Sequence, residues 1–264
     1  MKGLMLSMVI MLTGYCLNAQ DGNITKVNGV ELYYETYGEG PTMVLLHHFC
    51  ASHEIWNQWI EQLSKDYYLV VPDLRGHGKS SNPTQTYEHQ ESARDIYRLL
   101  EHLEVDEFKA IGAGAGSMAL LEMARMEPQR ISSMVILSPG ICHPPEEKAI
   151  TSFNSAPEDW LSHMKKIHAG GESQIRMLIS QYKQLATQYE RIYPDVSQYD
   201  HIDCPVLIIH DESKQVISGG IPISPASSDE KTCRKIAPHI SHTSIDNQRL
   251  PEKLVELTRS FIKE

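Results

Sequence analysis

The chain lacks several features that would place it in a specialised class of protein. No two cysteines form a CxxC pair, and no cysteine–histidine spacing resembles a structural zinc site. Internal repeats and low-complexity tracts are also missing. Positive charge is scarce, because 24 Lys and Arg residues stand against 34 Asp and Glu residues, for a formal net charge of -10. Nucleic acids and anionic membrane surfaces repel an acidic protein, so we expect neither as a partner.

Long hydrophobic runs are absent except near the start of the chain. Residues from Leu4 to Leu12 are apolar apart from Ser7, and this run is too short to span a bilayer. Lys2 precedes it, and Ala19-Gln20 offers a cleavage point. The pattern predicts a signal peptide over residues 1–20 and a periplasmic or secreted mature protein without a membrane span. An unusual N-terminal helix is the alternative interpretation.

The cysteines bear on export in two ways. Cys16 suggests lipid attachment, but Tyr15 is too bulky for the small residue expected before a lipidated cysteine. An oxidising compartment permits a disulfide in the mature protein, although the sequence assigns no pairing. Free and partly buried thiols are the simpler interpretation for the four remaining cysteines: Cys50, Cys142, Cys204 and Cys233.

Residues 21–264 are expected to form one α/β domain. Short β-rich runs alternate with helical patterns, which predicts a parallel sheet with helices on both faces. The strands are expected at residues 30–34, 42–46, 67–71, 108–111, 134–137 and 206–209. Between about residues 138 and 199 only helical segments are found. This insertion is expected to form a small helical lid over the carboxyl edge of the sheet.

Several segments, taken in order, resemble those of the α/β-hydrolase superfamily. The sequence VPDLRGHGKS at residues 71–80 is similar to the family's Asp-x-Arg-Gly-x-Gly-x-Ser turn. Weaker resemblances lie at residues 27–34, 38–41, 45–49, 204–210 and 241–242. The similarity runs from about residue 24 to residue 262. It implies the α/β-hydrolase fold, with a mostly parallel sheet flanked by helices and a small helical lid.

The nucleophile elbow departs from the family pattern. The family places G-x-S-x-G at a tight strand-to-helix turn, and here residues 111–117 read IGAGAGS. Gly112 and Gly116 match the flanking glycines, so Gly114 occupies the nucleophile position. Glycine adopts the strained elbow conformation freely, but it has no atom that can form an acyl intermediate.

A shifted register would make Ser117 the nucleophile instead. The family's proline after the elbow helix lies fourteen residues past the nucleophile, and Pro128 lies fourteen residues past Gly114. With Gly114 at the nucleophile position, Ser117 falls in the first turn of the helix and points away from the site.

The other two members of the expected triad differ in how far they are retained. Lys214 stands where the resemblance implies the acid, and a lysine cannot accept the imidazole N–H. Asp211 and Glu212 are possible substitutes from nearby positions. His242 matches the family's histidine and is expected after a last short strand near residues 233–237. It serves either as a general base or only as a hydrogen-bonding side chain at the pocket edge.

The resemblance also implies an oxyanion pocket. The backbone N–H groups of Phe49 and Ala115 match the donor positions, and His48 replaces the usual glycine. We expect Asp73 and Arg75 to fix their turn through hydrogen bonds. No spacing among the histidines supports a metal site, and we expect no cofactor.

These patterns predict a protein that lacks the usual serine nucleophile and acid. It is expected to bind a small, partly apolar molecule, or to carry out non-covalent chemistry, in the pocket of the family. The alternative is an active hydrolase on a small ester or lactone, using His242 with water or Ser117. A third possibility is an interaction module whose lid surface binds another protein.

Overall fold

A computed structural model describes residues 22–137, 152–187, 202–211, 216–218, 221–223, 241–245 and 250–262. The predicted signal peptide therefore lies outside the described residues and stays a prediction. Within the described part of the chain, no helix is long and apolar enough to cross a membrane.

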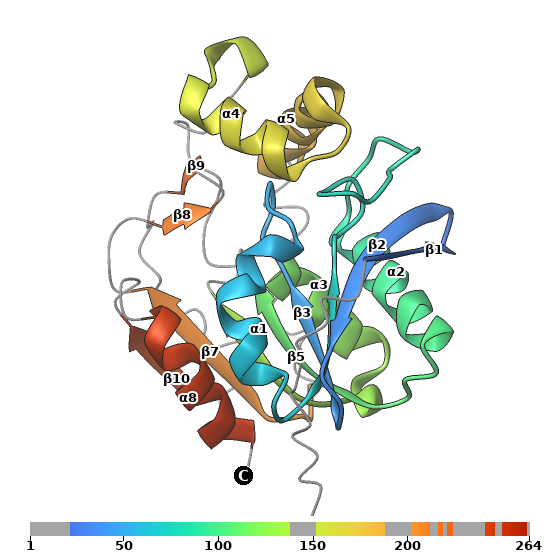
Figure 1. Cartoon of the computed structure of the whole chain (residues 1–264), viewed down its shortest axis with the longest axis vertical. Helices are drawn as coiled ribbons and strands as arrows, with labels where there is room; N and C mark the ends of the chain where they lie inside the picture. The colour runs from blue at the N-terminus through green and yellow to red at the C-terminus, as the bar shows by residue number, and fades with distance from the viewer. Residues whose placement is uncertain are drawn as a thin grey trace, which may run out of the picture.

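The centre of the molecule is an eight-stranded sheet in the order β1-β2-β4-β3-β5-β6-β7-β10 (Figure 1). Strands β1 and β2 are antiparallel, β2 is antiparallel to β4, and the remaining neighbours are parallel. The strands are β1 (Asn23–Val27), β2 (Val30–Tyr37), β3 (Thr42–Leu46), β4 (Tyr68–Pro72), β5 (Phe108–Ala113), β6 (Ile131–Leu137), β7 (Val206–Asp211) and β10 (Ser241–Ile245). A separate antiparallel pair is formed by β8 (Val216–Ser218) and β9 (Ile221–Ile223).

Helices cover both faces of this sheet (Figure 1). Alternate strand residues point to opposite faces, so apolar residues fill a core on each side. Val44 and Leu46 of β3 pack into the core beneath α2 (His89–His102) and α3 (Ala115–Met126). Met43 and Leu45 pack into the core beneath α1 (Asn57–Leu63) and α8 (Leu250–Ile262). The predicted α/β architecture is confirmed.

The helices of the predicted lid lie above the carboxyl ends of the parallel strands (Figure 1). They are α4 (Glu158–Ile167) and α5 (Gly171–Thr187), preceded by the 3-10 turn η4 (Phe153–Ser155). Trp160, Met164 and Leu178 extend the core of the α2–α3 face into the lid. The predicted ends of the insertion, at residues 138–151 and 188–199, lie outside the described residues.

Two strands of the eight-stranded sheet, β1 and β10, and the separate pair β8 and β9 were missing from the sequence-based prediction. Strand β1 alternates poorly in polarity and is mostly exposed, so it has no apolar run to reveal it. Strand β10 consists of the residues SHTSI, and it contains His242 itself. The expectation that His242 follows the last strand was therefore wrong, because the structure places it second in that strand. Residues 233–237 lie outside the described part of the chain.

Candidate functional site

The turn from β5 to α3 is the predicted elbow. Gly114 lies at its tip with φ 49° and ψ -109°, a backbone conformation that L side chains rarely adopt. Its N–H donates to the carbonyl of Leu137 at the end of β6, over 3.0 Å. The N–H of Gly116 donates to the carbonyl of His47, also over 3.0 Å, and so joins the elbow to the turn after β3. The elbow is thus held by backbone groups on both sides.

Ser117 lies behind the elbow, in the first turn of α3. Its side chain is fully buried, and its hydroxyl lies 2.7 Å from the carbonyl oxygen of Gly112 and 3.0 Å from that of Leu137. The single hydroxyl proton is shared between the carbonyl oxygens of Gly112 and Leu137, because a carbonyl oxygen can only accept a hydrogen bond. The side chain therefore bridges β5 and β6.

His48 lies directly beside Gly114. A Cβ atom built on Gly114 would be 3.0 Å from the Cβ of His48, closer than side-chain carbons normally approach. The Nδ1 of His48 lies 3.0 Å from the carbonyl oxygen of Phe49, so this nitrogen carries the proton and donates it. Burial lowers the pKa of His48 and outweighs the hydrogen bond to the carbonyl of Phe49, which raises it. His48 is therefore a neutral imidazole between the elbow and the lid.

The two predicted oxyanion positions meet at the same edge of the sheet. Ala115 opens α3, where the N-terminus of a twelve-residue helix attracts negative charge. Phe49 follows His48 in the turn after β3 and is buried, with its ring in edge-on contact with those of His77 and Tyr87. The structure brings Gly114, His48, Phe49 and Ala115 together.

His242 is not brought next to this group by its backbone. It pairs with Ile208, which continues a row through Ile136 to Gly112. Three inter-strand spacings of about 4.8 Å separate β10 from β5, so its backbone lies roughly 14 Å from that of Gly112. Asp211 is the last residue of β7. The other two acid-site residues, Glu212 and Lys214, lie outside the described residues.

Comparison with known proteins settles the family. Residues 41–176, just over half of the chain, match the family model described as alpha/beta hydrolase fold. The chain belongs to the alpha/beta hydrolase fold family. It is 30% identical over 156 residues to the soluble epoxide hydrolase of Corynebacterium sp. (strain C12), covering 58% of this chain and 52% of that protein. It is 32% identical over 122 residues to the non-heme chloroperoxidase of Streptomyces lividans, covering 44% of each. The chain thus spans about half the length of these curated relatives.

Solved structures show the same alpha/beta hydrolase fold at lower identity. Epoxide hydrolase VrEH1 from Vigna radiata superposes with a TM-score of 0.68 at 19% identity, covering 92% of this chain and 97% of the other. The enol-lactonase from Burkholderia xenovorans LB400 superposes with a TM-score of 0.64 at 18% identity, covering 92% and 100%.

A second polar centre of this alpha/beta hydrolase fold protein lies in the turn after β4. The buried Asp73 carboxylate accepts hydrogen bonds from the backbone N–H and the Nδ1 of His53, at 2.7 and 2.8 Å, and from the N–H of Lys79 at 2.8 Å. The other ring nitrogen of His53, Nε2, lies 3.2 Å from the Glu35 carboxylate. Gly78 must lack a side chain here, because a Cβ would lie 2.1 Å from the Asp73 carboxylate. The expected role of Asp73 in fixing its turn fits these contacts.

His53 is charged in this setting. Burial alone would lower its pKa, but the hydrogen bonds to Asp73 and Glu35 outweigh burial and raise that pKa to about 9. Burial alone would raise the pKa of Glu35, but hydrogen bonds from His53 and from the hydroxyls of Tyr33 and Tyr37 lower it to about 2. Sequence reasoning missed this carboxylate–imidazolium–carboxylate group, because its members come from three separate segments.

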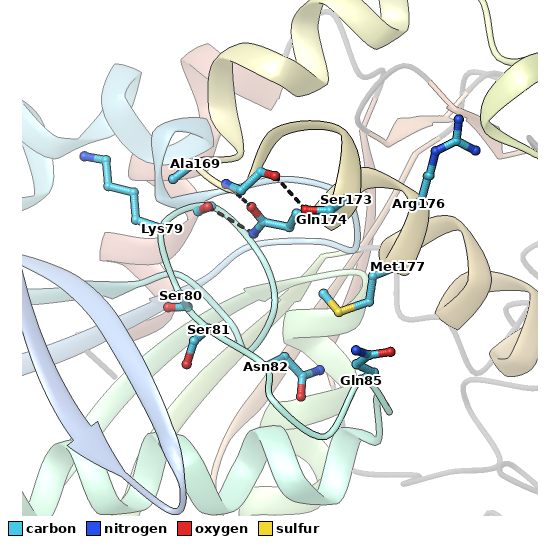
Figure 2. A pocket seen from close by; sticks show the side chains of 12 residues that line it. Lys79, Ser80, Ser81, Asn82, Gln85, Ala169, Ser173, Gln174, Arg176 and Met177 are labelled. Carbon is cyan, nitrogen blue, oxygen red and sulfur yellow. Dashed lines mark hydrogen bonds between the residues drawn. The ribbon is translucent and has the colours of Figure 1, made fainter.

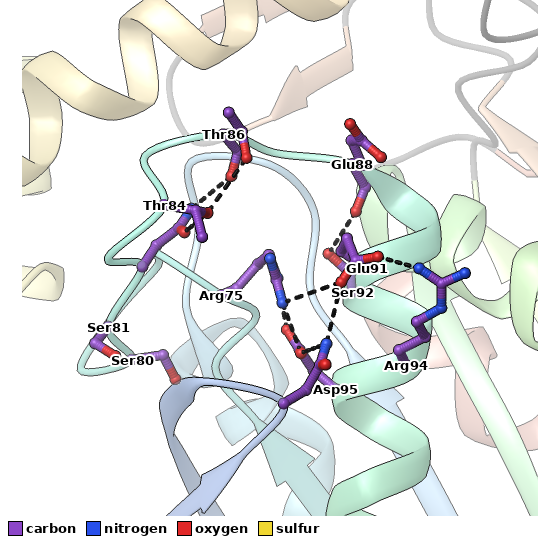
Figure 3. A network of polar contacts seen from close by, with 12 residues as sticks. Arg75, Ser80, Ser81, Thr84, Thr86, Glu88, Glu91, Ser92, Arg94 and Asp95 are labelled. Atoms are coloured by element: carbon purple, nitrogen blue, oxygen red, sulfur yellow. Dashed lines mark hydrogen bonds and ion pairs between the residues drawn. The ribbon is translucent and has the colours of Figure 1, made fainter.

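Arg75 is held by a buried ion pair (Figure 3). Its Nε and one terminal nitrogen donate to the Asp95 carboxylate at 2.6 and 2.7 Å, in the bidentate geometry that suits arginine. Asn28 donates to the same carboxylate at 2.8 Å. Burial alone would lower the pKa of Arg75, but Asp95 keeps it above its usual value. This pair ties the turn after β4 to helix α2.

The lid is fastened to the same turn (Figure 2). The N–H of Gly78 donates to the Nδ1 of His168 at 2.8 Å, and the Ala169 N–H donates back to the Gly78 carbonyl at 3.0 Å. The Gln174 amide donates to the carbonyls of Gly76 and Gly78. A groove of about 720 Å³ lies beside these contacts, lined by residues 78–82, 85, 169, 170, 173, 174, 176 and 177. Gly114 is not among its lining residues, and the side chains of Lys79, Ser81, Gln174 and Arg176 contact neighbouring protein groups.

The described residues contain two free cysteines and no candidate metal site. Cys50 and Cys204 are buried free thiols, and burial raises the pKa of both. Cys142 and Cys233 lie outside the described residues. In the part of the chain that the structure describes, no three His, Cys, Asp or Glu residues are grouped to hold a metal ion.

Proposed function

We propose that this chain binds a small, partly apolar molecule at the elbow, beneath the lid, without forming a covalent enzyme intermediate. Gly114 is the observation that carries the proposal, since it supplies no nucleophilic atom at the tip of the elbow. Removing the nucleophile of a serine hydrolase costs roughly a millionfold in turnover, which no binding interaction restores. The name of the Corynebacterium relative, an epoxide hydrolase, supports a small molecule as the ligand.

Ser117 is a poor replacement nucleophile in this proposal. Its hydroxyl is fully buried and donates its proton to main-chain carbonyls rather than to an imidazole. A nucleophilic hydroxyl must instead give its proton to a base and must reach the substrate. Ser117 is better explained as a link between the ends of β5 and β6.

Hydrolysis of a small ester or lactone through water is the second candidate function. The retained His242 and the similarity to lactonases favour it. Substitution of His242 by alanine decides between the two candidates, because only the water route needs the imidazole.

The test uses a fluorophosphonate probe, 4-nitrophenyl acetate and a panel of small acids, esters and lactones. We expect no labelling beyond that of a Ser117→Ala control, and no turnover. We expect saturable stabilisation by at least one panel compound, of roughly 5 to 10 °C in unfolding midpoint at a hundredfold excess over Kd. Labelling at Ser117 would contradict the proposal. Turnover without labelling that His242→Ala abolishes would favour the water route, and no stabilisation by any compound would count against binding.

A further inference from the structure

The side chain of His48 and the missing side chain of Gly114 fit together. A Cβ built on Gly114 lies 3.0 Å from the His48 Cβ and 3.6 Å from its Cα, and apart from its chain neighbours no other atom of the described residues is within 4 Å. Among the described residues other than its chain neighbours, His48 alone crowds a side chain at position 114. The resemblance in sequence places a glycine at position 48 in the family, and a glycine would remove the nearer of these two atoms.

His48 cannot easily move aside, because its backbone is held on both sides. The carbonyl of His48 accepts the Ala51 N–H at 3.2 Å and the Nδ1–H of His47 at 2.8 Å. His47 in turn accepts the Leu74 N–H on its Nε2 at 2.9 Å, and its carbonyl accepts the Gly116 N–H. A carbon that is only one bond from this backbone has little freedom, so the contact with position 114 cannot relax through a rotamer change.

We propose that His48 closes the elbow: its Cβ excludes a nucleophile's side chain from position 114, and its imidazole forms the wall that a bound molecule meets there. His48 is then a specificity-determining residue of the site. The first half of this inference, the steric exclusion by Cβ, stands by itself. The second half, the role of the imidazole as a wall of the ligand site, rests on the proposed binding function. The neutral imidazole between elbow and α4 gives the wall a polar edge.

The contact with position 114 is made by the Cβ of His48, so a test can separate this atom from the imidazole. His48→Ala keeps that atom, whereas His48→Gly removes it. Gly114→Ser is therefore combined with each change in turn. Gly171→Ser is the matched control for backbone strain, since Gly171 has φ 57° and no described residue beyond its chain neighbours lies within 4 Å of its built Cβ.

We expect Gly114→Ser to lower the unfolding midpoint by about 3 to 8 °C more than Gly171→Ser does. Adding His48→Gly should recover most of this excess, and adding His48→Ala should not. If Gly114→Ser does not fold, Gly114→Ala carries the same Cβ and replaces it. Folding that returns only with His48→Gly supports the proposal. An excess that is absent, or that His48→Ala relieves equally well, overturns the steric half.

Ligand binding tests the second half separately. The panel of acids, esters and lactones is applied to the wild type, His48→Ala and His48→Gly. We expect the truncations to change which compounds stabilise the protein, with bulkier compounds gaining at least fivefold in affinity relative to small ones. An unchanged order of affinities overturns the specificity role. A wild type that binds nothing refutes the proposed function instead, and leaves the steric result standing.

Discussion

The two turns that follow strands β4 and β5, which lie on either side of β3 in the sheet, are built in opposite ways. The turn after β4 is held by charged side chains, with Asp73 fully buried among donors and Arg75 in a bidentate pair. The elbow after β5 is held almost entirely by backbone groups and by glycines. Both turns have the shape expected of the alpha/beta hydrolase fold. The comparison indicates that the first turn depends on buried charged side chains for its shape, whereas the elbow depends on backbone groups.

The strongest test of this difference between the two turns is to remove the Asp73 carboxylate. We expect Asp73→Ala to cost about 3 to 5 kcal/mol in free energy of unfolding, because it leaves His53 buried with one of its two carboxylates missing. Urea denaturation measures it. Glu61→Ala is the control, since its ion pair with Lys65 is mostly exposed and should contribute less than about 1 kcal/mol. Equal costs for the two variants would show that the turn after β4 does not depend on its buried charges.

The charge on His53 gives the same turn a pH dependence. Below pH 6.5 the imidazole is protonated in both the folded and the unfolded protein, so its pairing contributes fully to stability. Between pH 6.5 and about 9 only the folded protein keeps the proton, and the contribution is progressively lost. The difference in unfolding free energy between wild type and His53→Gln should therefore shrink as pH rises through this range. A difference that is constant from pH 6 to 10 would show that His53 is not charged.

At the elbow, the corresponding change is Ser117→Ala, with the smallest expected effect. It removes a donor shared by two buried carbonyls, and one of these, on Leu137, keeps the Gly114 N–H. We expect a cost of about 1 kcal/mol in unfolding free energy and no change in binding of the ligand panel. Ser117→Thr should not serve as a neutral substitute, because adding a methyl group at a fully buried position usually costs stability. Loss of ligand binding in Ser117→Ala would assign this serine to the site.

Much of the fold could be predicted from the chain alone, because buried parallel strands carry apolar runs on both faces. Strands β3, β5 and β6 are of this kind. The SHTSI sequence of β10 has no such run, and its membership in the sheet depends on pairing with β7. Local pattern therefore could not reveal it.

In the candidate site, too, local sequence features could be predicted and contacts between distant segments could not. Glycine at position 114 could be identified from spacing, since neighbouring glycines and Pro128 fix the register. Its contact with His48 could not, because that distance is set by how two separate turns meet across the sheet. The Glu35–His53–Asp73 group was hidden for the same reason.

Gly78 has a consequence for how this protein can change over time. Any side chain there would overlap the Asp73 carboxylate, so the two positions constrain each other. A lineage that keeps the acid must keep the glycine, and a variant at position 78 becomes tolerable only after the acid has gone. Drift at this turn should therefore proceed in a fixed order, with the charge lost first and the bulk gained second.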